Sequence, residues 1–220
     1  GRYNYRTRCI DTYKGRAMMD PAEVTIAEVL REANYRTGIY GKWHLGDLYP
    51  MRPMDQGFED SLIHRGGGIG QPSDPIGAEG KYTDPTLLKN GIETPMKGYC
   101  TDIYFDGAMD FIESAVKRKE NFFTYIATNA PHGPYHDVPE KLYQEYLKVD
   151  FRPIMINKKI SPARLKSETD KLARICAMIT NIDENVGRLF RKLDQLGIRE
   201  NTIVMYLNDN GPNSMRYVGN

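Results

Sequence analysis

The chain has 220 residues, with 30 Lys and Arg against 29 Asp and Glu, which gives a formal net charge of +1. This balance argues against nucleic-acid binding through a basic patch, and no apolar run is long enough to span a bilayer. With 40% apolar and 27% charged residues, the composition is typical of one globular domain with a sizeable core.

The first predicted elements are a helix and a strand near the N-terminus. In DPAEVTIAEVLREAN (20–34), Asp20 is a candidate N-cap, Pro21 suits the first turn, and Glu23 lies three residues after the cap. Apolar residues at helical spacing follow. RTGIYGKW (36–43) then predicts a short strand.

The middle of the chain is rich in turn signals. Residues 48–100 contain many Gly, Pro and Asp, with six glycines in 66–80, and predict a long surface excursion. A helix is then expected over 102–118, an apolar strand over 121–129, and a short helix over 138–148.

The strongest periodic pattern lies near the C-terminus and predicts a long helix that ends at Gly197. Its apolar stripe consists of Leu172, Ile175, Ile179, Ile182, Val186, Leu189, Leu193 and Leu196. NTIVMYLND (201–209) then predicts a buried strand. We expect strands 37–42, 122–128 and 202–208 to be parallel neighbours. The alternation of strands and helices predicts an α/β fold, with a sheet that has helices on its faces.

Polar residues follow each of these three strands. Lys42 and His44 follow the first, His132 the second, and Asp209 and Asn210 the third. In open α/β sheets, ligands bind beyond the carboxyl ends of the strands, so we expect these groups to converge. Taken singly, each has a structural explanation: an exposed lysine with a structural histidine, a loop histidine between prolines, and a tight turn.

The chemistry of the groups favours a shared site. Asp209 and Asn210 offer hard oxygen ligands suited to Ca²⁺ or Mg²⁺. Lys42, His44 and His132 offer positive charge or hydrogen-bond donors for an oxyanion, and this combination suits hydrolysis of a sulfate or phosphate ester. His64 and His136 lack a comparable context and are interpreted as structural.

Three stretches resemble the sulfatases of the alkaline phosphatase superfamily. NYRTGIYGKWHLG (34–46) is similar to their second signature, with Asn34 in place of glycine. APHGPY (130–135) is similar to their histidine loop. ICAMIT through NDNGP (175–212) resembles their long helix, strand and metal loop, with Asn208 where serine is frequent. The order and spacing of these stretches cover nearly the whole chain.

The resemblance implies a fold and a role for each site residue. It implies an alkaline phosphatase-like sheet with helices on both faces. Lys42 and His132 would hold the sulfate group, and His44 would contact the nucleophile and help to eliminate sulfate from it. Asp209 and Asn210 would bind the metal, usually calcium, with Mg²⁺ as the alternative.

The family nucleophile is a formylglycine made from the first residue of Cys/Ser-x-Pro/Ala-x-Arg, and this motif is absent here. Cys9, Cys100 and Cys176 do not begin it, nor do Ser61 and Ser161. These three cysteines also fit neither a zinc site nor a disulfide framework, so we interpret them as structural thiols, with one disulfide as the alternative.

GRYNYR at the start of the chain resembles the end of the nucleophile motif. We therefore expect 1–220 to be the central part of a single catalytic domain, without its N-terminal strand and its C-terminal part. The piece by itself is expected to be inactive. The family's aspartate pair in the metal site and its later lysine would also lie outside the chain.

Two other interpretations stay open. One is a phosphodiesterase or phosphonate hydrolase of the same superfamily, and the other is a non-catalytic binding protein with the same fold. The expected partner is a small-molecule or carbohydrate sulfate ester, with no nucleic acid and no membrane span. The resemblance implies an extracytoplasmic location, periplasmic or secreted.

Overall fold

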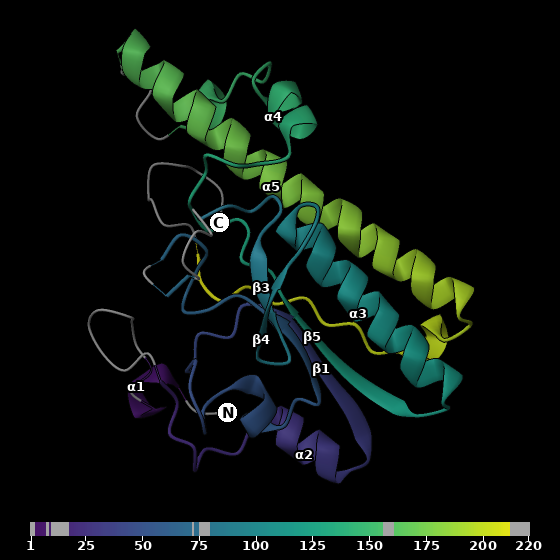
Figure 1. Cartoon of the computed structure of the whole chain (residues 1–220). Coiled ribbons are helices and arrows are strands. Elements are labelled where there is room, and N and C mark those ends of the chain that lie inside the picture. The colour runs from purple at the N-terminus through teal and green to yellow at the C-terminus, as the bar shows by residue number, and fades with distance from the viewer. Residues whose placement is uncertain are drawn as a thin grey trace.

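The computed structural model describes residues 3–7, 9, 18–71, 73–74, 80–155 and 161–211 (Figure 1). The strands form one sheet of order β4-β3-β2-β1-β5. Their bounds are β1 (Tyr35–Gly41), β2 (Asp60–Ile63), β3 (Thr86–Lys89), β4 (Ile92–Pro95) and β5 (Asn121–Ala127). The helices are α1 (Asn4–Thr7), α2 (Ile26–Glu32), α3 (Cys100–Lys117), α4 (Glu140–Tyr146) and α5 (Pro162–Gln195). Short 3₁₀ turns are η1 (Pro53–Gln56), η2 (Arg152–Ile154) and η3 (Arg199–Asn201).

β1 is parallel to both of its neighbours, β2 and β5. β3 is antiparallel to β2, and β4 is antiparallel to β3, so the sheet is mixed. The carboxyl ends of β1, β2 and β5 therefore lie at the same edge of the sheet. This edge is where the sequence places Lys42, His44 and His132.

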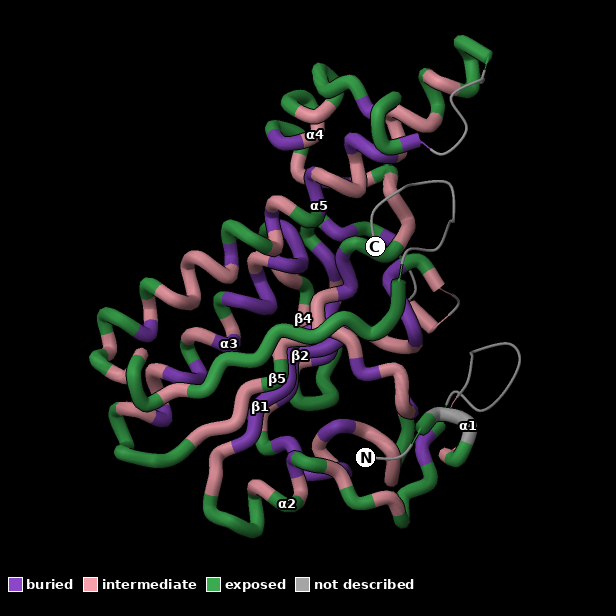
Figure 2. Tube along the Cα trace, turned by 180° about the vertical axis from the view of Figure 1, so that it is seen from behind, coloured by how far each residue is buried: buried purple, intermediate pink, exposed green. Residues whose placement is uncertain are grey.

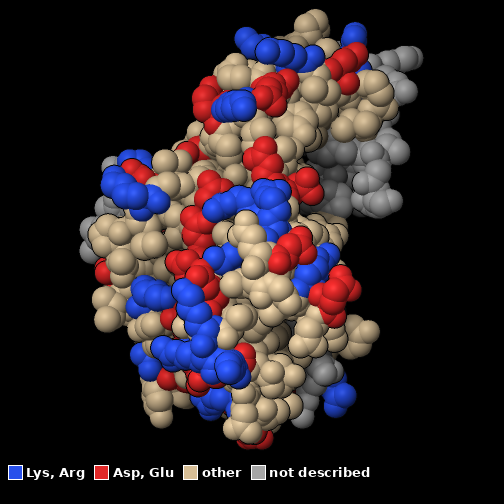
Figure 3. Space-filling view, turned by 90° about the vertical axis from the view of Figure 1, so that its right-hand side faces the viewer, with Lys and Arg blue, Asp and Glu red and all other residues tan. Residues whose placement is uncertain are grey.

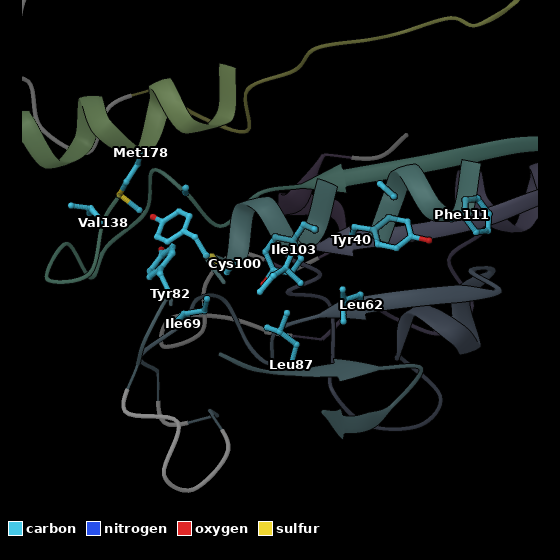
Figure 4. Packing of buried hydrophobic residues seen from close by; sticks show 14 of the residues in the cluster. Tyr40, Leu62, Ile69, Tyr82, Leu87, Cys100, Ile103, Phe111, Val138 and Met178 are labelled. Carbon is cyan, nitrogen blue, oxygen red and sulfur yellow. The ribbon is translucent and has the colours of Figure 1, made fainter. Parts of the chain in front are cut away.

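Helices cover both faces of the sheet, as expected. On one face, α3 and α5 enclose a core that includes Tyr40, Leu62 and Ile103 (Figure 4). On the other face, Ala27 of α2 packs in a second core with Ile39 and other apolar residues. Side chains alternate between the two faces along β1 and β2, so each strand contributes to both cores.

The region interpreted as a surface excursion, 48–100, instead contains three strands of the sheet. Leu62 and Ile63 of β2 and Leu87 and Leu88 of β3 are buried. Each of these strands has only four residues. Such short apolar runs between turn residues carry little period-two signal, and their burial comes from packing against distant elements.

Helix α2 begins at Ile26, five residues later than an Asp20 cap would place it. Thr25 and Glu28 form a complete capping box: Glu28 N donates to Thr25 Oγ1 over 3.1 Å, and Thr25 N donates to Glu28 Oε2 over 2.8 Å. Asp20 instead accepts a hydrogen bond from Ala22 N in a turn. The helix therefore begins at the reciprocal cap of Thr25 and Glu28 and not at Asp20.

Helix α5 begins at Pro162, ten residues before the predicted stripe, with Ser161 as its N-cap. It ends as predicted, because Gly197 adopts φ of 69°, which glycine accepts readily. One stripe position differs: Ile179 is 48% exposed. Asn181 and Asn185 are buried instead, because both donate to Asp102 of α3 over 2.9 and 2.6 Å.

The predicted third strand, 202–208, is not a strand among the described residues. It runs as an extended segment beyond η3 and is exposed along nearly its whole length (Figure 2). Ile203 is 88% exposed and Leu207 is 82% exposed. An apolar run becomes a strand only when a neighbour completes its hydrogen-bond ladder, and β5 pairs only with β1 within the described part of the chain. β5 itself is half-buried, with Tyr125 46% exposed, whereas we expected burial on both faces.

The charged side chains follow the balanced composition. On the face drawn in Figure 3, Lys and Arg lie among Asp and Glu. Several charged side chains of the described residues form ion pairs, such as Arg188 with Asp106. No helix within the described ranges is long and apolar enough to cross a membrane.

Gly41 joins β1 to β5 at a close backbone approach. Its φ is +118°, and a Cβ built on it would lie 1.9 Å from the Ala127 carbonyl oxygen. We expect Gly41→Ala to lower the free energy of unfolding by about 2 to 4 kcal/mol, because strain and a backbone clash combine. Chemical denaturation would measure this change.

Gly187→Ala is the matched control, because Gly187 lies in α5 and its nearest neighbour for a Cβ is the flexible end of Arg191 at 3.4 Å. Glycine to alanine at this helical position should raise the free energy of unfolding by up to about 1 kcal/mol. Equal effects at the two positions would contradict the close approach at Gly41.

Candidate active site

Lys42 is the first residue after β1. Its backbone N–H donates to the Ala127 carbonyl over 2.6 Å, which ties the end of β1 to the end of β5. Trp43 turns away into the second core and donates its Nε1–H to the Met51 carbonyl over 2.8 Å. Lys42 is half-buried, and its backbone is held by the bond to β5.

His44 has φ of 57°, in the left-handed region that non-glycine residues rarely adopt. Such strained positions concentrate at functional sites. The loop after β2 lies directly against its ring: a Cβ built on Gly67 would lie 2.5 Å from His44 Nε2. Only glycine at position 67 leaves room for the imidazole.

Hydrogen bonds hold the start of the same loop in place. The Gly66 N–H donates to both carboxylate oxygens of Asp47 over 3.0 and 3.1 Å. The Gly67 N–H donates to Gln71 Oε1 over 3.0 Å. A Cβ on Gly68 would lie 3.5 Å from His132 Nδ1, so the loop runs from His44 to His132.

His132 lies in the loop after β5 and is exposed. The buried Tyr82 donates its hydroxyl to the His132 carbonyl over 2.7 Å and accepts from the Asn129 side chain, which fixes this loop. The Nδ1 of His132 lies 2.6 Å from the Gly133 carbonyl oxygen. Because a carbonyl can only accept, Nδ1 carries the proton, and Nε2 donates to an anion only when the ring is protonated.

His64, which the sequence led us to interpret as structural, lies among the candidate site residues. It follows β2 and is 3% exposed. Burial lowers the pKa of His64 to about 4, against an opposing hydrogen bond to the Arg65 carbonyl, and Lys42, His44 and His132 make smaller contributions to the lowering. His64 therefore lies near the predicted residues, at the carboxyl ends of β1, β2 and β5.

The predicted metal loop lies on the extended C-terminal segment. Asp209 and Asn210 are exposed; Asn210 N donates to Asp209 Oδ1, and the Asn210 side-chain amide donates to the Gly211 carbonyl, each over 2.8 Å. The charge of Asp209 contributes to raising the pKa of Tyr125 in β5, after the larger effect of burial. A convergence of this loop with Lys42 and His132 stays a prediction.

The donor set suits a hard divalent cation but does not complete its coordination shell. A carboxylate and an amide oxygen are ligands that Ca²⁺ and Mg²⁺ accept. No group of three or more His, Cys, Asp or Glu that could hold a metal occurs within the described ranges. A metal site at Asp209 and Asn210 stays a prediction.

The buried ring of His64 makes stability depend on pH. Its pKa is about 4 in the fold, against about 6.5 when unfolded, so the unfolded chain binds more protons between these values. We expect the free energy of unfolding to fall by on the order of 2 kcal/mol as the pH drops from 7 to 4.5. Denaturation curves of wild type and His64→Gln across this range would measure it. If the free energy of unfolding depended on pH equally in the two proteins, His64 would not be the source of this dependence.

Comparison with known proteins places this arrangement in a family. The family model described as Sulfatase matches residues 1–219. The chain belongs to the sulfatase family. An arylsulfatase of Klebsiella aerogenes is 28% identical, over 86% of this chain and 47% of that protein. The N-acetylgalactosamine-6-sulfatase of Rattus norvegicus is 27% identical, over 86% of this chain and 33% of that protein.

Solved structures share the fold of this chain. The crystal structure of Ps i-CgsB has a TM-score of 0.63 and 25% identity, covering 87% of this chain and 40% of that one. A protein crystallised with its substrate D-glucosamine-2-N,6-O-disulfate has a TM-score of 0.57 and 20% identity, covering 84% of this chain and 49% of that one. The chain shares the fold of these two structures, which is alkaline phosphatase-like. This sulfatase chain spans a third to a half of the length of the relatives above.

Proposed function

We propose that the chain is part of an enzyme that hydrolyses sulfate esters with a formylglycine nucleophile and a divalent metal. The observation that carries this proposal is the match to the sulfatase family, and it is supported by the position of Lys42, His44 and His132 after the carboxyl ends of the parallel strands β1 and β5. A compact group of cationic donors is suited to an anionic tetrahedral group.

The proposed roles follow from the chemistry of each side chain. Lys42 presents up to three N–H donors to sulfate oxygens, and its backbone is anchored to β5. Protonated His132 donates from Nε2, because its Nδ1 faces the Gly133 carbonyl. His44, held beside Gly67, transfers a proton at the nucleophile as sulfate leaves.

Asp209 and Asn210 would hold the metal, preferably Ca²⁺, which would neutralise charge on the sulfate group and on the nucleophile. Two ligand residues leave most of a shell of six to eight oxygens to water. We therefore expect the 220-residue chain to bind Ca²⁺ with a dissociation constant well above 1 µM. Titration calorimetry would measure it, and a submicromolar value would indicate a different site.

The nucleophile is proposed to lie outside this chain, because none of its cysteines or serines begins the required motif. The substrate class is proposed to be a carbohydrate or small-molecule sulfate ester. The names of the N-acetylgalactosamine-6-sulfatase and the arylsulfatase support these two options. An extracytoplasmic location is proposed from the family resemblance alone.

Paired substrates test the function in the full-length enzyme that carries this chain. We expect hydrolysis of an aryl sulfate to exceed that of the matching phosphate diester by at least about 100-fold. Mass spectrometry of the nucleophile peptide should reveal formylglycine. A preference for the diester would favour the phosphodiesterase interpretation, and inactivity toward both esters with sulfate binding intact would favour a binding protein.

A further inference from the structure

His64 and Lys42 lie at matching positions after the neighbouring strands β2 and β1. The β1–β2 register pairs Gly41 with Ile63, so Lys42 and His64 are the next two residues along their parallel strands. Residues at matching positions of neighbouring strands project to the same side, with backbones about 4.8 Å apart. Lys42 therefore stands between His64 and the end of β5, to which its N–H is bonded.

The ring of His64 presents a lone pair to this position. Its Nδ1 lies 2.9 Å from the Arg65 carbonyl oxygen, and because the carbonyl can only accept, Nδ1 carries the proton. Nε2 is then an acceptor. It is buried and has no hydrogen-bond partner within the described part of the chain. Buried acceptors are normally paired, so this one calls for a donor.

The strand register points to Lys42 as the donor, because Lys42 and His64 follow the paired residues Gly41 and Ile63. Lys42 also contributes more to lowering the pKa of His64 than His44 and His132 do. Burial keeps the ring neutral at neutral pH, which preserves the lone pair. A neutral acceptor beside an ammonium can form a charge-assisted hydrogen bond.

We propose that His64 is a positioning residue whose Nε2 accepts a hydrogen bond from the Lys42 ammonium and aims it at the bound sulfate group. This inference rests on the proposed function. A lysine side chain is flexible, and an acceptor fixed in the sheet restricts where its charge can lie. Two ammonium protons remain for sulfate oxygens.

Nitrogen-15 NMR of labelled histidine tests the contact directly in the 220-residue chain. We expect the His64 ring to be in the Nδ1–H form, with an Nε2 resonance that is shifted by a hydrogen bond. Lys42→Met should return Nε2 to the position of an unpaired nitrogen. A His64 Nε2 resonance that is the same in wild type and Lys42→Met would overturn the proposal.

Kinetics of the full-length enzyme test the consequence. Some residues act by orienting a functional group through a hydrogen bond. Around metal ligands, mutation of such a residue typically lowers metal affinity or activity about 10- to 100-fold. His64→Leu should therefore lower kcat at least about tenfold, whereas His64→Gln, whose amide oxygen can replace Nε2, should stay within about threefold of wild type. His136→Leu is the matched control, because it removes an exposed histidine.

The outcomes separate this proposal from the proposed function. Normal kcat for His64→Leu with a large loss for Lys42→Ala would refute positioning and leave the sulfatase function standing. Normal kcat for both variants would remove Lys42 as well as His64 from the site, whereas only a wild-type enzyme that hydrolyses no sulfate ester would refute the function itself. Equal losses for His64→Leu and His64→Gln would indicate a role of ring shape and overturn the hydrogen bond. Should His64→Leu unfold, the NMR comparison with Lys42→Met decides the question.

Discussion

Replacing Lys42 with alanine in the full-length enzyme is expected to lower kcat about 100- to 1,000-fold. The ammonium would face a sulfate oxygen that gains charge as the S–O bond breaks, and removing one such preorganised donor typically has this effect. The fold should remain, because Lys42 is half-buried after the end of β1 and lies outside both cores. The free energy of unfolding of Lys42→Ala should stay within about 0.5 kcal/mol of the wild-type value.

Lys42→Arg and Lys97→Ala complete this experiment. Arginine should restore little activity, because its planar fork differs from the compact charge of an ammonium. Lys97 pairs with Asp84 on the surface and is 89% exposed, so its loss should change neither kcat nor Tm measurably. An unchanged kcat for Lys42→Ala would remove Lys42 from the site.

The 220-residue chain by itself is expected to show no turnover of an aryl sulfate. It contains positive donors but no residue that begins the nucleophile motif, and without the attacking group the covalent step is lost. The measurement is release of aryl alcohol with excess Ca²⁺, compared with the full-length enzyme in the same assay. Calcium-dependent hydrolysis by the purified chain, abolished by Lys42→Ala, would contradict a nucleophile outside it.

The parts of the fold that depend on local pattern could be predicted from the sequence. The 3.6-residue periodicity indicated α5 and its end at Gly197, and the apolar runs indicated β1 and β5. Polar residues after these strands indicated one edge of the sheet. The carboxyl ends of β1, β2 and β5 do lie at one edge of the sheet, whereas a shared site of Lys42, His44 and His132 stays a prediction.

The parts of the fold that depend on distant contacts could not be predicted from the sequence. β2, β3 and β4 have four residues each, and only packing distinguishes them from turns. His64 was missed for this reason, although DSLIH repeats the pattern of an apolar run followed by histidine. The burial of Asn181 and Asn185 depends on Asp102, far away in the sequence. Residues 202–208 have a strand-like composition, but no strand pairs with them in the described structure.

An NMR titration of the 220-residue chain with inorganic sulfate tests most directly whether Lys42, His44 and His132 form a sulfate site. We expect saturable shifts at Lys42, His44, Gly67 and His132, with competition by an aryl sulfate and loss in Lys42→Ala. Chloride at equal ionic strength should leave these resonances unchanged. Saturable shifts at other surfaces, with these four residues unaffected, would contradict the site.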